Sequence, residues 1–214
     1  MKQSEATLGS TVGAPGEVCG LRRSTVRPLP SGVLNDDYHL TCDALVRGLR
    51  VGYAPGARSV ETVSASLSDE LERRTRVAAG TWQTTLSHLS LCSPRSGWTA
   101  VAFGSHRVLR SLVVPPLLPL LWVGSLVRAR RSPSARALLA VQTLGYASAA
   151  LGMAVDTRIL ALPLQFVLTN LATLRGARRH LSGSQPLVWQ RAHRGGWVDA
   201  DGQRDVGSPL RRQA

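Results

Sequence analysis

Two adjacent carboxylates, Asp36 and Asp37, follow Asn35 where the residue pattern predicts the start of a helix. A carboxylate held at a junction between a loop and a helix can take a proton from an incoming hydroxyl group, as a general base does. The same pair also complements the positive end of a helix dipole, which stabilises a helix by about 0.3–1 kcal/mol. On spacing alone, capping and dipole compensation are the simpler explanation.

A second group of polar side chains recurs at the spacing of helix turns. Arg73, Arg76, Gly80 and Gln83 fall on one face of the next predicted helix. Guanidinium groups form paired hydrogen bonds with phosphate oxygens, so two arginines beside a glycine can hold a diphosphate. Trp82 lies next to this face, where it can stack on a ring or pack in the interior. Taken alone, the spacing favours a solvated charged face.

The elements that would position these groups are short. One helix is expected between Asn35 and Gly48, because a glycine commonly ends a helix. A second is expected from Asp69 to about Leu86, with Ser68 as its cap. Helices that follow strands are typical of an α/β arrangement. The expected strands cover residues 18–22, 50–53 and 57–63.

Composition narrows the class of protein. The chain has 214 residues, a formal net charge of +13 and 43 % hydrophobic residues. This apolar content excludes a disordered chain, and the absence of a glycine period excludes a collagen-like one. Cys19, Cys42 and Cys92 lack the spacing of a metal site or a disulfide scaffold, so reduced thiols are expected. Aromatic residues do not alternate with the arginines, which excludes a nucleic-acid partner.

Three apolar segments, at 109–127, 137–155 and 159–174, dominate the second half of the chain. A helix needs about 20 apolar residues to cross a bilayer, so two or three transmembrane or interfacial helices are expected. The first segment contains three prolines and should be kinked, because proline removes a helix hydrogen bond. The chain thus divides into a domain at 1–107, a membrane region at 108–174 and a basic polar tail at 175–214.

Arginines flank these segments unevenly. They cluster between the first and second segments and again after the third, whereas the short loop between the second and third segments holds Asp156 and Arg158. Since basic loops stay in the cytoplasm, the second and third segments should form a hairpin whose short loop lies outside. The first segment would then lie along the membrane surface or re-enter it, although a full crossing stays open. The basic flanks favour lipid headgroups as partners.

Several stretches, in order, resemble the C-terminal half of membrane-bound family 2 glycosyltransferases, a group related to cellulose, hyaluronan and poly-N-acetylglucosamine synthases. The likeness runs over about residues 5–194. It implies an α/β fold, the acceptor half of a GT-A-like catalytic domain at 1–107, followed by membrane helices. The stretches are GLRRS at 20–24, LNDDYHL at 34–40, GLRVGYAPGA at 48–57, Glu61, ERRTRVAAGTWQ at 72–83 and SHRVLR at 105–110.

The resemblance implies an inverting transfer of a sugar from a nucleotide-sugar donor to a hydroxyl group of a glycan or lipid acceptor. Asp37 matches the family's general base, and Asp36 matches the acidic residue that orients the site. Arg76 matches the arginine that neutralises the leaving diphosphate. Arg73 stands where glutamine is usual, and a tryptophan of the motif is replaced at position 77, so Trp82 is the nearby ring that could contact the substrate.

The family's nucleotide-binding half, which carries the D-x-D motif for Mg or Mn, has no counterpart before Gly16. We attribute the D-x-D at 199–201 to chance and assign no metal ligand to this chain. The resemblance therefore implies a truncated or split enzyme in the cell membrane, multi-pass, with its soluble part in the cytoplasm. Another chain is a candidate source of the missing half. The alternative hypothesis is a non-catalytic membrane protein that binds a partner or lipid.

Overall fold

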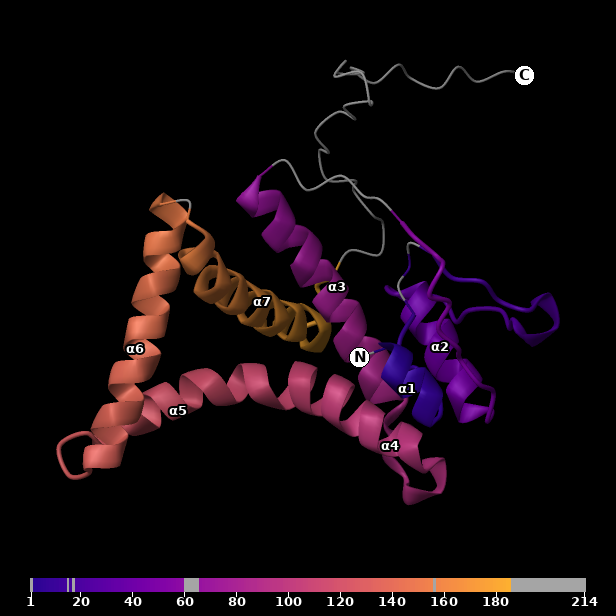
Figure 1. Cartoon of the computed structure of the whole chain (residues 1–214), viewed down its shortest axis with the longest axis horizontal. Helices are drawn as coiled ribbons and strands as arrows, with labels where there is room; N and C mark the ends of the chain where they lie inside the picture. The colour runs from indigo at the N-terminus through magenta and orange to yellow at the C-terminus, as the bar shows by residue number, and fades with distance from the viewer. Residues whose placement is uncertain (1, 15, 17, 60–65, 156, 186–214) are drawn as a thin grey trace, which may run out of the picture.

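The computed structural model describes residues 2–14, 16, 18–59, 66–155 and 157–185, and this part of the chain is helical. The elements are α1 (Lys2–Leu8), η1 (Arg23–Thr25), α2 (Asp36–Val46), α3 (Leu67–Ser87), η2 (Leu89–Cys92), η3 (Pro94–Ser96), α4 (Trp98–Phe103), η4 (Gly104–Val113), α5 (Val114–Arg128), α6 (Pro133–Ala154) and α7 (Arg158–Leu181). Figure 1 shows α3 between α7 on one side and α1 and α2 on the other, while α4 and α5 form a long arc that leads to α6.

The predicted α/β fold is wrong, because the described residues contain no β-strand and form no GT-A-like sheet. Short strands are stable only when neighbouring strands pair with them. Here Val51 O accepts a hydrogen bond from Thr11 N at 3.0 Å, and Val51 N donates one to Ser10 Oγ at 2.7 Å. The expected strand at 18–22 is irregular and leads into η1, and residues 60–63 of the third lie outside the described residues.

The two helices predicted in the first half are confirmed, with one shift at a cap. α2 begins at Asp36, and Gly48 follows its end with a φ of +73°, which a residue with a side chain rarely adopts. α3 begins earlier than expected. Its cap is Ser66 rather than Ser68, since the Ser66 hydroxyl accepts a hydrogen bond from Asp69 N at 3.1 Å.

A small apolar core joins α2 to α4 and to the segment after α1. Its buried residues are Val12, Tyr38, Cys42, Leu45, Leu91 and Phe103. The Tyr38 hydroxyl lies 3.0 Å from Thr85 Oγ1, which links this core to α3. Burial raises the pKa of Tyr38 above its usual value and that of the Cys42 thiol to about 12. Cys42 is fully buried, as expected for a packed thiol, whereas Cys19 and Cys92 are exposed.

The first apolar segment belongs to one long helix, built from α4, η4 and α5, that runs from Trp98 to Arg128. Pro115 and Pro116 have no amide hydrogen, and the ten residues before α5 adopt the wider π-helical winding. The prolines therefore bend the helix without ending it, and Figure 1 shows the result as a shallow arc.

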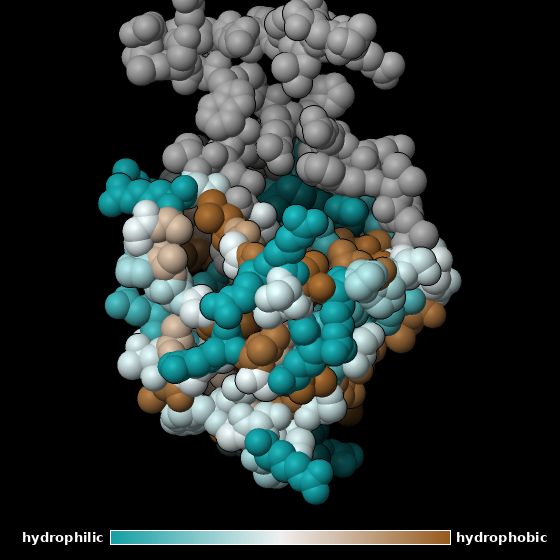
Figure 2. All heavy atoms as spheres, turned by 90° about the vertical axis from the view of Figure 1, so that its right-hand side faces the viewer, coloured by the Kyte–Doolittle hydropathy of each residue, from teal (hydrophilic) through white to brown (hydrophobic). Residues whose placement is uncertain are grey.

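α6 and α7 correspond to the other two predicted segments, and all three long helices are apolar and long enough to cross a membrane. Their large side chains are strongly exposed: Ile159 is 83 % exposed and Leu162 is 77 % exposed. Figure 2 shows a different character at the end formed by α1, α2 and the start of α4, where hydrophilic and neutral side chains surround smaller apolar patches. Exposed apolar helices of this kind indicate association with a membrane.

α3 packs against the C-terminal half of α7 through small side chains. A side chain at Gly176 would bring its Cβ to 2.6 Å from Ala79 N and 2.8 Å from Thr75 O. Ala172, Ala79 and Thr75 are almost completely buried in this contact region. The helix backbones approach so closely that no methyl group fits between them.

Replacement of Gly176 by alanine is expected to destabilise the protein by about 1–3 kcal/mol, because the new methyl group meets backbone atoms of α3. The measurement is thermal unfolding in detergent micelles. Gly145→Ala in α6 is the matched control, since a Cβ there meets nothing within 4 Å. Equal unfolding temperatures for the two variants would contradict the close packing.

A second prediction concerns the edge-on contact between His39 of α2 and His88, whose ring centroids lie 4.9 Å apart. Burial and the neighbouring His88 lower the pKa of His39 below its usual value, and Asp43 partly offsets this effect. The unfolded chain then binds more protons, so stability is expected to fall as the pH drops below about 6.5. Thermal unfolding across pH 5–8 measures this loss, and His39→Gln should weaken it. The same pH dependence in both proteins would refute the effect.

Candidate functional site

The segment that carries the paired carboxylates is docked on α3. Asn35 Nδ2 donates a hydrogen bond to Val77 O at 2.9 Å, although the sequence suggested Asn35 as a helix cap. Its side chain fills the space over Gly80, where an added Cβ would overlap the Asn35 Cγ and Oδ1 atoms. Asn35 therefore joins the start of α2 to the middle of α3.

Gln83 binds the same segment one turn further along α3. Its Oε1 accepts from Leu34 N at 3.0 Å, and its Nε2 donates to Gly32 O at 2.9 Å. Both polar atoms of the Gln83 amide thus bind backbone groups of the loop before Asp36. The helix face predicted to carry Gly80 and Gln83 is the face that holds the acidic segment.

Asp36 and Asp37 occupy the first turn of α2, and their environments differ. Asp36 is exposed, and its Oδ1 accepts a hydrogen bond from Asp37 N at 2.9 Å. Asp37 is half-buried, and its carboxylate lies against Gly16, where an added Cβ would be 3.1 Å from Oδ2. The less exposed carboxylate is therefore the one predicted to act as the base.

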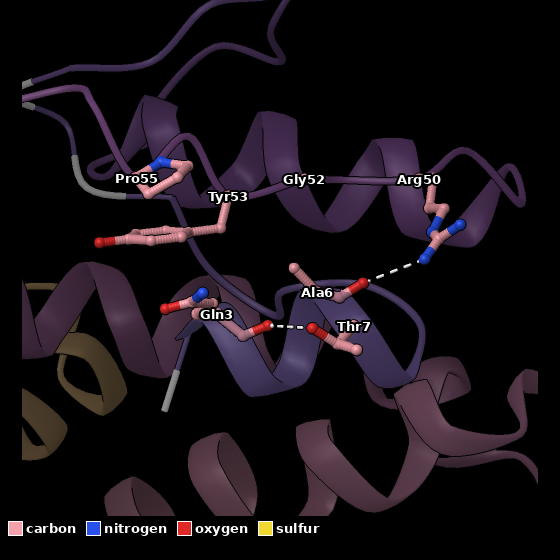
Figure 3. Close-up of a pocket in the computed structure, with 7 residues that line it drawn as sticks. All are labelled: Gln3, Ala6, Thr7, Arg50, Gly52, Tyr53 and Pro55. Atoms are coloured by element: carbon pink, nitrogen blue, oxygen red, sulfur yellow. Dashed lines mark hydrogen bonds between the residues drawn. The ribbon is translucent and has the colours of Figure 1, made fainter.

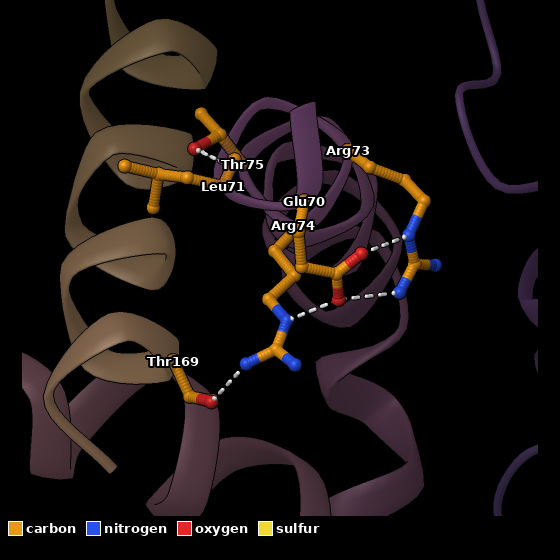
Figure 4. Close-up of polar contacts among 6 residues, drawn as sticks. All are labelled: Glu70, Leu71, Arg73, Arg74, Thr75 and Thr169. Atoms are coloured by element: carbon orange, nitrogen blue, oxygen red, sulfur yellow. Dashed lines mark hydrogen bonds and ion pairs between the residues drawn. The ribbon is translucent and has the colours of Figure 1, made fainter. Parts of the chain in front are cut away.

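The predicted binding residues on α3 separate into two groups. Arg73 forms a paired contact with Glu70, with both nitrogen–oxygen distances 2.9 Å, while Arg74 reaches from Glu70 to Thr169 of α7 (Figure 4). Arg73 thus takes part in an ion-pair group on α3. Arg76 is half-buried on the turn next to Val77 and Gly80, where the acidic segment docks.

Trp82 lies on α3 beside Gln83 and is half-buried. Its indole Nε1 is buried without a hydrogen-bond partner among the described residues. A half-buried ring on α3 is compatible both with packing and with contact to a substrate ring.

The GLRVGYAPGA stretch lines an open pocket of about 330 Å³ against α1. Figure 3 shows Tyr53 and Pro55 on one side of this pocket and Gln3 on the other. Arg50 donates from Nε to Gly9 O at 2.6 Å and from Nη2 to Ala6 O at 3.0 Å, which satisfies carbonyls at the end of α1. The arginine of this stretch therefore stabilises the fold locally.

The protein-family model described as "Glycosyl transferase family group 2" matches residues 1–174 of the chain. The chain belongs to this family. The match spans both the part with the paired carboxylates and the three apolar helices, so both halves are family features. No curated protein and no solved structure matches the chain.

Membership of this family supports glycosyl transfer as the general activity and implies a nucleotide-sugar donor and an acceptor. Family 2 enzymes commonly use a divalent metal. In the described part of the chain, no cluster of three or more His, Cys, Asp or Glu side chains is placed to hold one, so these residues do not fit a metal site. The D-x-D at 199–201 lies outside the described residues.

No individual role was predicted for Arg107 or Gly13, two residues that lie near the acidic segment. Arg107 of η4 donates from Nε to Val12 O at 3.0 Å, and its guanidinium lies 4.5 Å from the Tyr38 ring centroid. Gly13 leaves the space that this guanidinium occupies. Position alone gave no signal, because Arg107 is distant in sequence from both partners.

If Gln83 holds the acidic segment, Gln83→Ala should speed hydrogen–deuterium exchange at the Leu34 amide, because that N–H loses its acceptor. Exchange within α7 should not change. Thr173→Ala on α7 is the control, since the Thr173 hydroxyl donates to Thr169 O of its own helix. Unchanged exchange at Leu34 in the Gln83 variant would contradict the docking.

Proposed function

We propose that this glycosyltransferase chain serves the inverting transfer of a sugar from a nucleotide-sugar donor to a hydroxyl group of a glycan or lipid acceptor at the cell membrane. The observation that carries the proposal is the docking of the acidic segment on α3, through Asn35 and Gln83, beside the turn that carries Arg76. Family membership supports the general class of reaction.

In the proposed step, the Asp37 carboxylate removes the proton from the acceptor hydroxyl. The acceptor oxygen then attacks the anomeric carbon, and the bond from that carbon to the diphosphate oxygen breaks. Arg76 compensates the negative charge of the departing nucleoside diphosphate, because a guanidinium group suits phosphate oxygens. Asp36 orients the site by accepting the hydrogen bond from Asp37 N. We also propose that Arg73 and Trp82 contact the nucleotide-sugar donor.

The location of this chemistry is part of the proposal. The three long apolar helices are compatible with a multi-pass chain in the cell membrane. We place the acidic segment and α3 on the cytoplasmic side, where nucleotide sugars are made available. An acceptor at the membrane surface would then reach Asp37 from the side of the lipid.

Asp37→Asn is expected to lower sugar transfer by about 10²–10⁴-fold, because an amide cannot accept the hydroxyl proton. Transfer is measured in membranes that contain the full chain, with a panel of radiolabelled UDP- and GDP-sugars. Asp69→Asn is the matched control, since Asp69 is also a first-turn carboxylate and contacts Ser66 at its helix cap.

The same membranes test the role of Arg76 through inhibition by the nucleoside diphosphate product. Arg76→Ala should weaken inhibition, whereas Arg95→Ala, which removes an exposed charge from η3, should not. Full activity of Asp37→Asn would remove Asp37 from the reaction. A chain with no transfer and no saturable binding of UDP or GDP would support the non-catalytic alternative.

A further inference from the structure

The segment that follows α1 is buried although it forms no helix. Ser10, Thr11 and Val12 are 6 %, 3 % and 2 % exposed. Backbone groups that are buried outside regular elements need partners from elsewhere in the chain. On one side, Val51 supplies them through its hydrogen bonds with Ser10 and Thr11. Residues 9–14, here called the linking segment, are therefore fixed on this side without a sheet.

On the other side, two consecutive residues of η4 hold the polar backbone groups of Val12. Val12 O accepts a hydrogen bond from Arg107 Nε at 3.0 Å. Val12 N donates to Glu5 Oε2 at 3.3 Å, and Glu5 Oε1 pairs with His106 Nδ1. The Glu5 side chain belongs to α1, which lies beside the long arc (Figure 1), and is only 9 % exposed. Both polar groups of a buried residue thus depend on η4, one directly and one through a buried carboxylate.

The π-helical winding of η4 explains how both side chains reach the same segment. An α-helix turns by about 100° per residue, so that neighbouring side chains diverge. The wider winding turns less per residue, which brings His106 and Arg107 closer to one face of η4. Windings of this kind occur frequently at functional sites.

Arg107 also contacts the first turn of α2. Its guanidinium carbon lies 4.5 Å from the ring centroid of Tyr38, a buried residue that directly follows Asp37. Gly13 makes room for this group, because the three atoms nearest to an added Cβ all belong to the Arg107 guanidinium, which it would overlap. The Asp37 carboxylate itself lies against Gly16, shortly after the linking segment. Arg107 therefore contacts both parts of the chain that border Asp37.

We propose that Arg107 is a positioning residue for sugar transfer, which fixes the direction of the Asp37 carboxylate through Tyr38 and the linking segment. The inference rests on the proposed function, in which Asp37 is the base. In this role Arg107 touches neither the donor nor the acceptor. Displacing the base slows the chemical step, whereas Arg76 on α3 keeps its place for the donor. The expected signature is therefore a lower kcat with an unchanged KM for the nucleotide sugar.

Gly13→Ala tests the proposal, because it displaces the Arg107 guanidinium without removing the charge. In membranes that contain the full chain, kcat for sugar transfer should fall by about 10–100-fold, the loss expected when a catalytic group moves by about 1 Å. KM for the nucleotide sugar and inhibition by the nucleoside diphosphate should keep their wild-type values. Gly20→Ala is the matched control with wild-type kcat, since a Cβ there meets nothing within 4 Å.

A double-mutant cycle tests whether the effect of Gly13→Ala runs through Arg107. Arg107→Gln should lower kcat in the same way, and the double variant should be no slower than the slower single variant, because both changes remove one contact. Arg110→Gln, which removes an exposed arginine from the same element, should keep the wild-type kcat. Losses of kcat that multiply in the double variant, a wild-type kcat in either single variant, or a loss that appears in KM would overturn the proposal.

Hydrogen–deuterium exchange in detergent micelles tests the contact without reference to activity. Peptides that cover the linking segment should exchange faster in Gly13→Ala and in Arg107→Gln than in the wild type, whereas α6 should not change. Unchanged exchange in the linking segment would overturn the inference. Faster exchange throughout α3 shows general unfolding: in one variant it leaves the decision to the other, and in both it would overturn the positioning role.

The same kinetic measurements separate this inference from the proposed function. A wild-type chain that transfers no sugar from any donor would remove the proposed function and this inference with it. Transfer by the wild type at a rate that Gly13→Ala matches would leave the proposed function standing and overturn the role of Arg107 alone.

Discussion

The close approach of α3 to α7 at Gly176 is the constraint on which the arrangement of this chain depends. One side of α3 meets α7 through Thr75, Ala78 and Ala79, with no room for a methyl group. Another side holds the acidic segment through Val77 and Gln83. Since packed helices do not deform gradually, α3 transmits the position of α7 to the start of α2. The carboxylates are therefore held relative to a helix that is long and apolar enough to cross a membrane.

The helices could be predicted from local signals, whereas the predicted strands do not form in the described part of the chain. The start of α2 directly after Asn35 and its end before Gly48 agree with the sequence, although the Asn35 side chain binds Val77 O of α3 and does not cap α2. The segments at 18–22 and 50–53 have strand-like composition, yet their pairing depends on neighbours that local sequence does not specify. In the structure, Ser10 and Thr11 bind the backbone of Val51 and replace such a neighbour. α7 extends past the predicted end at Leu174. The sequence places Gly176 and its charged neighbours in the polar tail, because their contact with α3 cannot be predicted from local sequence.

The candidate site residues stay predictions, and the structure shows contacts among their neighbours that the sequence did not indicate. On spacing alone, the helix face with Gly80 and Gln83 was expected to be solvated, and in the structure it holds the loop before Asp36. Arg73, expected beside Arg76 in diphosphate binding, forms its paired contact with Glu70. The contacts of Asn35 and Gln83 join residues that are about forty or more positions apart, so neither helical spacing nor capping preferences could reveal them. Family membership supports glycosyl transfer, and the docked segment supplies a physical reason for proposing Asp37 as the base.

The central claim is that the start of α2 and the middle of α3 form one substrate site. Photoaffinity labelling tests it most directly, with an azido derivative of UDP or GDP bound to the full chain in membranes and the attachment points mapped by mass spectrometry. Labels within residues 32–40 and within α3, both lost in excess unmodified nucleotide, are the predicted result. Competable labels confined to other segments, such as the pocket beside Tyr53, would contradict the claim.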